Sequence, residues 1–86
     1  MDKLVYFTKH AEQKFADLAE LGFVVTREQV IETIHNPDSI DRAIDPPIAQ
    51  KVISKQHLLR VVFVEEDDKI VVVTFYPGAK KRYDQN

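Results

Sequence analysis

The first half of the chain carries hydrophobic residues at helical spacing behind a short apolar opening. Residues 4–7 are aliphatic or aromatic, which favours a short strand because such side chains fit a pleated sheet surface. From residue 9, apolar side chains recur three and four positions apart, so they lie along one stripe of a helix. Thr8 precedes this helix as an N-cap, and Gly22 is expected to end it because glycine readily adopts a left-handed backbone.

A second helix is predicted between Thr26 and Asn36. Thr26 and Gln29 have the spacing of a capping box, in which each side chain bonds the backbone amide of the other residue. Apolar residues at helical spacing follow. Asn36 is expected to end the helix, because the residue before a proline, here Pro37, is pushed out of the helical backbone region.

The second half of the chain changes to alternation and short apolar runs. Residues 39–44 and 48–55 are predicted to form a hairpin around a proline-containing turn. The strongest strand candidates are residues 58–65 and 69–76, which are rich in Val, Ile, Leu and Phe. Helices that precede a run of strands predict the α+β class, with two N-terminal helices packed on one face of a mainly antiparallel, strongly twisted sheet of four to five strands. The other sheet face is then left open.

Composition narrows the class of protein. A chain of 86 residues, 44 % hydrophobic and 30 % charged, is expected to form a single domain over residues 1–86, with a basic tail at residues 79–86. The formal net charge of −2 argues against a protein that binds long nucleic acids through its overall charge. A local basic patch is compatible with this net charge. Without cysteine, thiolate chemistry is excluded. No signal peptide or membrane-spanning run is evident, so a cytoplasmic protein without membrane association is expected.

Arg60 is the first candidate for chemistry, because it interrupts an apolar strand. A guanidinium there is expected to face the open side of the sheet, where it contacts an anion or covers its strand neighbours with its aliphatic stem. His57 begins the same strand, and Lys51 and Lys55 lie on the preceding one, so these groups are expected to border the same region. His57 is either a general acid or base near neutral pH or a solvated turn residue.

The tail contributes the one basic cluster of the sequence: Lys80, Lys81, Arg82 and Tyr83. A tail that leaves the last strong strand can fold back across the open sheet face. These side chains would then lie near Arg60 and form a cationic pocket with a hydroxyl group. The alternative is a basic chain end that serves solubility.

No metal site or cofactor is expected. His10 shares a helix face with Lys14 and has no second histidine or carboxylate at ligand spacing. His35 lies at a helix end, where a cation is favourable. The acidic run at residues 65–68 lacks the alternating oxygen ligands and glycine of a calcium loop, which leaves a solvated turn that protects a sheet edge.

A further indication comes from the order of short segments along most of the chain: His10-Ala11, Gly22-Phe23, Val30-Ile31, Asn36-Pro37, Leu59-Arg60-Val61-Val62, Val72-Val73-Thr74-Phe75-Tyr76-Pro77 and Arg82-Tyr83. In this order they resemble a family of small uncharacterised prokaryotic domains related to the RelE/ParE toxin superfamily and to BrnT-type toxins. The resemblance implies a compact sheet with two N-terminal helices. It also implies an antitoxin as a partner.

RelE-like members cleave messenger RNA, usually on the ribosome, by driving the 2′-hydroxyl onto the adjacent phosphate without a metal, whereas ParE-like relatives inhibit gyrase. Four side chains are implied as catalytic by this resemblance: Arg60, Arg82, Tyr83 and His57. The arginines would stabilise the phosphate charge, and the tyrosine or the histidine would exchange a proton. Lys80 or Lys81 would assist them.

Two features depart from the resemblance. RelE-type toxins tend to be strongly basic, whereas this chain is acidic overall, and Lys14 stands where the related family often has an arginine. Two hypotheses follow. One is a toxin-like, metal-independent endoribonuclease that acts on RNA or the ribosome, and the other is a non-enzymatic module of the same fold that binds a partner protein.

Overall fold

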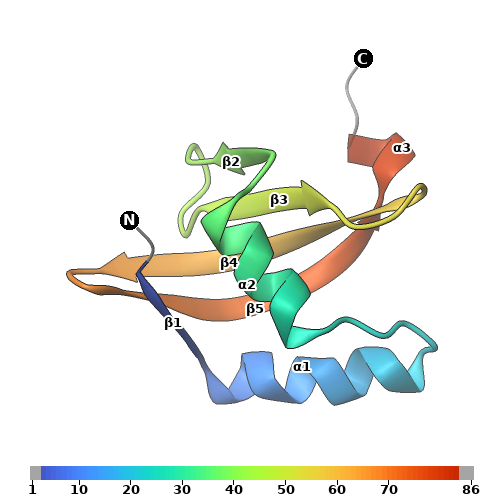
Figure 1. Ribbon diagram of the computed structural model, residues 1–86, viewed down its shortest axis with the longest axis horizontal. Helices are drawn as coiled ribbons and strands as arrows, with labels where there is room; N and C mark the ends of the chain where they lie inside the picture. The colour runs from blue at the N-terminus through green and yellow to red at the C-terminus, as the bar shows by residue number, and fades with distance from the viewer. Residues whose placement is uncertain (1–2, 84–86) are drawn as a thin grey trace.

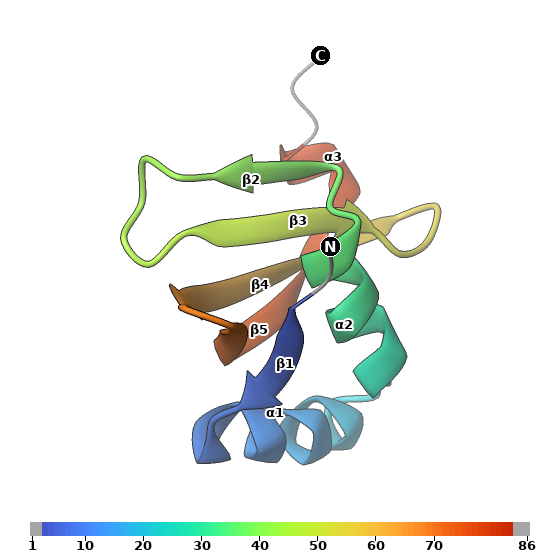
Figure 2. The same ribbon diagram turned by 60° about the vertical axis from the view of Figure 1, so that its left-hand side comes forward.

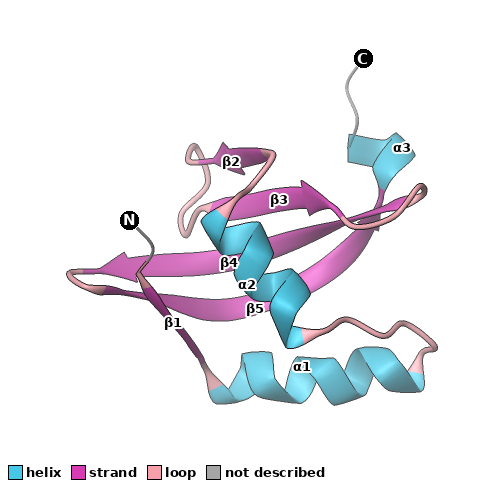
Figure 3. Cartoon of the chain, viewed as in Figure 1, coloured by secondary structure: helices cyan, strands magenta, loops and turns pink. Residues whose placement is uncertain are grey.

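The protein, described here as a computed structural model over residues 3–83, has the predicted α+β class (Figures 1 and 3). Its elements in chain order are β1 (Leu4–Phe7), α1 (Lys9–Glu20), α2 (Arg27–His35), β2 (Ser39–Asp41), β3 (Ile48–Val52), β4 (His57–Glu66), β5 (Lys69–Ala79) and α3 (Lys80–Tyr83). Side chains are described as far as residue 81. No helix in this part of the chain has the length and apolar character needed to cross a membrane.

The strands form one mixed sheet in the order β1-β5-β4-β3-β2. β1 runs parallel to β5, and the other three pairings are antiparallel. The expected hairpins of β2 with β3 and of β4 with β5 are both present. Because β5 is the last strand of the described chain, the parallel pairing places its first and last strands side by side.

β5 runs to Ala79, three residues beyond the predicted end at residue 76. Pro77 follows the predicted end directly, and a proline has no backbone N–H to donate to a sheet. Pro77 pairs with Leu59 of β4 on one side, while β1 pairs with β5 only as far as Val72. A proline is tolerated in a strand that lacks a neighbour on one side, because no ladder hydrogen bond is lost there.

The helix termini follow the local sequence signals. Thr8 Oγ1 accepts a hydrogen bond from the Ala11 amide at 3.0 Å, and Gly22 adopts a φ of 83° just after α1 ends. At the start of α2, the Gln29 amide donates to Thr26 Oγ1 at 3.1 Å, and the Thr26 amide donates to Gln29 Oε1 at 2.9 Å. The predicted capping box is confirmed.

Replacing Thr26 with alanine is therefore expected to lower the free energy of unfolding by about 1 kcal/mol, because the Gln29 amide loses its acceptor. Thr26→Ser keeps the hydroxyl and serves as the matched control, with nearly wild-type stability. Urea denaturation followed by circular dichroism measures both. Equal losses in the two variants would show that the cap hydroxyl contributes nothing.

The hydrophobic core joins both long helices to the sheet. Figure 2 shows α1 below the strands and α2 beside them. Its buried members are Ala11, Leu18, Val25, Val30, Ile34, Ala49, Leu59, Val61, Phe63, Ile70, Val72 and Phe75. β4 contributes every second residue from Leu59 to Phe63, so these side chains define the core face of the sheet. The intervening β4 residues, which include Arg60, belong to the opposite face, called the outer face below.

Candidate anion-binding site

A depression of about 580 Å³ lies where the β3–β4 turn meets the junction of β5 and α3. Its lining residues come from two short segments: Lys55, Gln56 and His57, and Ala79, Lys80 and Lys81. We call it the basic depression. Of the described residues that line it, three are lysines and one is a histidine, so positive charge is its main chemical property.

Backbone hydrogen bonds hold the two segments of the basic depression together. His57 and Ala79 are partners at the end of the β4–β5 ladder. The Lys80 amide donates to the Gln56 carbonyl at 2.8 Å, and the His57 amide donates to Ser54 Oγ at 3.1 Å. The start of α3 is thereby fixed beside the turn, so Lys80 and His57 lie close together although they are far apart in sequence.

The described residues do not neutralise the charge of the basic depression. Among them, no acidic side chain lines it, and Lys55, Lys80 and Lys81 form no ion pair. Arg27 differs from them, because its Nη2 donates to Glu12 Oε1 at 2.7 Å, and this hydrogen bond raises the pKa of the guanidinium. Uncompensated ammonium groups around one hollow attract an anion.

His57 is held by a ring contact at the edge of the basic depression. Its imidazole meets the Phe23 ring edge-on, with ring centroids 4.8 Å apart, and its side chain is half-buried. The contact limits the orientations that the imidazole can adopt. Histidine is the side chain that most often acts as a general acid or base in enzymes.

Arg60 belongs to a different constellation on the outer face. Its cross-strand partners are Gln50 on β3 and Tyr76 on β5. Arg60 Nε donates to Tyr76 Oη at 3.0 Å, and Nη1 donates to Gln50 Oε1 at 2.5 Å. Gln50 and Tyr76 were not among the sequence candidates, although the register of the two predicted hairpins could have identified them as neighbours of Arg60.

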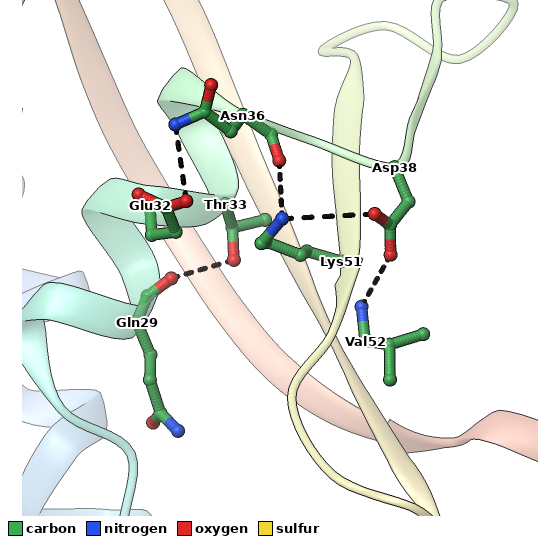
Figure 4. Close-up of polar contacts among 7 residues, drawn as sticks. All are labelled: Gln29, Glu32, Thr33, Asn36, Asp38, Lys51 and Val52. Carbon is green, nitrogen blue, oxygen red and sulfur yellow. Dashed lines mark hydrogen bonds and ion pairs between the residues drawn. The ribbon is translucent and has the colours of Figure 1, made fainter.

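The structure does not bring His57 or Lys51 beside Arg60. His57 precedes Arg60 by three positions, so the two side chains lie on opposite faces of β4. Lys51 pairs with Leu59 on the core face, where its Nζ donates to the Asn36 carbonyl at 2.8 Å (Figure 4). The same ammonium lies 3.9 Å from an Asp38 carboxylate oxygen. Lys51 thus binds the C-terminal end of α2.

The tail that was predicted to fold back across the open sheet face begins with α3. This short helix contacts β4 and β5. Lys80 and Lys81 line the basic depression. The side chains of Arg82 and Tyr83, which were expected near Arg60, lie outside the described residues.

The chemistry of the basic depression suits a phosphate group. Three ammonium groups can bind its oxygens, and the imidazole of His57 can exchange a proton with a hydroxyl held there. In the described part of the chain, no group of three or more His, Asp or Glu side chains is placed to hold a metal ion.

Comparison of the chain with protein-family models, with curated proteins and with solved structures finds no match.

Proposed function

We propose that the protein is the toxin-like component of a toxin–antitoxin pair and that it binds RNA at the basic depression. The observation that carries this proposal is the grouping of Lys55, Lys80 and Lys81 around His57, with no acidic side chain among the described residues of the lining. RNA presents a phosphate at every nucleotide, so a compact cationic hollow can hold one or two of them. The two helices that precede the last four strands of the sheet agree with the RelE/ParE-like fold that the resemblance implies.

The most concrete activity is metal-independent RNA cleavage. The 2′-oxygen attacks the adjacent phosphorus, the bond from phosphorus to the 5′-oxygen breaks, and the products are a 2′,3′-cyclic phosphate and a 5′-hydroxyl. In this proposal His57 accepts the proton of the 2′-hydroxyl, and water supplies the proton that the leaving 5′-oxygen takes. Lys80 and Lys81 stabilise the charge that develops on the phosphate oxygens. Arg60, which the resemblance implies as catalytic, lies on the opposite face of β4 from His57 and takes no part in this step. Arg82 and Tyr83 remain contributors implied by the resemblance.

Messenger RNA incubated with the protein in EDTA, with and without ribosomes, tests the activity. We expect fragments with cyclic phosphate ends, and His57→Gln should slow their formation by roughly 100-fold or more, since a general base contributes at least that much. His10→Gln changes an exposed histidine on α1 and should leave the rate unchanged. Intact RNA in every condition, together with normal growth on expression, would refute the nuclease proposal.

A second candidate function is a non-enzymatic module that binds a partner protein. The observation in its favour is the exposure of apolar side chains on the outer face, where Leu4 is 67 % and Tyr6 49 % exposed. Val64, two strands away in the same row as Tyr6, is also exposed. Interfaces are enriched in such tyrosines.

Co-purification with the protein encoded by a neighbouring short reading frame separates the two functions. A binding module loses this partner on Tyr6→Ser and never cuts RNA. A nuclease keeps cutting RNA when Tyr6 is changed.

A further inference from the structure

The β4–β5 hairpin carries opposite charges at its two ends. At one end, residues 65–68 are four acidic residues in a row, which we call the acidic turn. At the other end, the pairing of His57 with Ala79 joins the two segments that line the basic depression. Figure 1 shows the acidic turn at the far left, and the β3–β4 turn and α3 at the right. The negative and the positive group are therefore separated along the length of the hairpin.

Each end of the hairpin keeps charge that other described residues do not neutralise. Both glutamates of the acidic turn form ion pairs, the shortest at 3.3 Å. Asp67 and Asp68 are exposed at its tip and form no ion pair within the described part of the chain. The same holds at the basic depression for Lys55, Lys80 and Lys81. Two carboxylates and three ammonium groups are therefore available to a second molecule.

The acidic turn cannot reach the basic depression of its own chain. β4 runs between them for 10 residues, a length of about 30 Å at the rise per residue of a strand. β4 and β5 are paired along this whole length, so the hairpin stays extended. The complementary charges can therefore meet only between two copies of the protein.

We propose that the acidic turn of one copy of the protein occupies the basic depression of a second copy. Asp67 and Asp68 pair there with the ammonium groups of the lining lysines. Charge complementarity selects this occupant, because surfaces of opposite charge attract each other and surfaces of like charge are rejected. The acidic turn is also accessible, since no other element in Figure 1 extends as far to the left.

Occupation of the basic depression by a second copy excludes RNA from it. The aspartates and an RNA phosphate are both anions that need the same ammonium groups, so only one of them can be bound at a time. This competition rests on the proposed RNA binding, whereas the self-association itself does not. Self-association would therefore hold the protein in an inactive form when its concentration is high.

NMR relaxation of the ¹⁵N-labelled protein, which reports its rotational correlation time, tests the self-association. Exposed ion pairs are individually weak, so protein concentrations up to about 1 mM are used. At about 0.01 M salt we expect the correlation time to rise with protein concentration, together with shifts of the amide signals of residues 67–68 and 79–81. At about 1 M salt, where the screening length is about 3 Å, both changes should vanish. A constant correlation time at low salt, or a rise that high salt does not weaken, would overturn the proposal.

Charge reversal at each end of the hairpin locates the contact. Asp67→Lys with Asp68→Lys places positive charge at both ends, and Lys80→Glu with Lys81→Glu places negative charge at both. Each double variant alone should self-associate at least about tenfold more weakly than the wild type, because like charges then meet. An equimolar mixture of the two should recover wild-type association, since each variant supplies the charge that the other needs. A mixture that stays monomeric would overturn the proposal.

Lys9→Glu with Lys14→Glu is the matched control for net charge, because these lysines lie on α1 and belong to neither end of the hairpin. This variant should self-associate like the wild type, and a loss equal to that of the Lys80→Glu, Lys81→Glu variant would overturn the proposal. RNA binding is measured separately. If the wild type binds no RNA, the proposed function fails and the self-association result is unaffected. If RNA binds but the protein never self-associates, this inference alone fails.

Discussion

Replacing Lys80 and Lys81 with glutamine is expected to weaken RNA binding at least tenfold at about 0.1 M salt. Both ammonium groups line the basic depression, and neither is neutralised by an ion pair with another described residue. Each phosphate contact to a single strand releases counterions, so the slope of log affinity against log salt should become shallower by about 1.4 for two lost contacts. Fluorescence anisotropy with a labelled oligoribonucleotide over a range of salt concentrations measures both quantities.

The matched control for this prediction is Lys9→Gln with Lys14→Gln. These lysines lie on α1, and the change in net charge is the same. Their replacement should alter affinity only slightly and leave the salt slope unchanged. An equal effect of the two double variants would mean that RNA responds to net charge and not to the basic depression.

The largest expected effect on stability comes from replacing Phe75 with alanine. Phe75 is 0 % exposed in the core, and its ring centroid lies 4.7 Å from that of Phe15 on α1. Truncation of a buried phenylalanine lowers the free energy of unfolding by about 3–5 kcal/mol, from the lost burial and the cavity that remains. For a domain of this size the melting temperature should fall by more than about 12 °C.

Thermal unfolding followed by circular dichroism tests this prediction. Val64→Ala, on the outer face of β4, is the control and should cost less than about 1 kcal/mol because its side chain is already partly in water. A Phe75→Ala variant that melts with the control would contradict the core described here.

The features that could be predicted from the sequence are those set by neighbours along the chain. Thr26 and Gln29 reveal a capping box because both partners lie within four residues, and Gly22 reveals a helix end because its backbone requirement is local. The order of helices before strands likewise predicts the α+β class. The parallel pairing of β1 with β5 had no such signal, because it joins residues about 65 positions apart in the sequence.

The candidate site was predictable only in part. Lys55, His57, Lys80 and Lys81 were all selected from the sequence, but their grouping follows from the pairing of His57 with Ala79, which depends on how far β5 extends past Pro77. The separation of His57 from Arg60 could have been predicted from the sequence, because residues three apart in a strand lie on opposite faces. Gln50 and Tyr76, which bond to Arg60, could be identified as its neighbours only from the register of two hairpins.

The most direct test of the central claim, that the basic depression holds an RNA phosphate, is an NMR titration with a 2′-O-methyl oligoribonucleotide. The methyl group blocks attack by the 2′-oxygen, so binding is observed without cleavage. We predict shifts centred on the amides of residues 55–57 and 79–81 and on the imidazole of His57. Shifts centred instead on α1 or α2, or no shift at any oligonucleotide concentration reached, would contradict it.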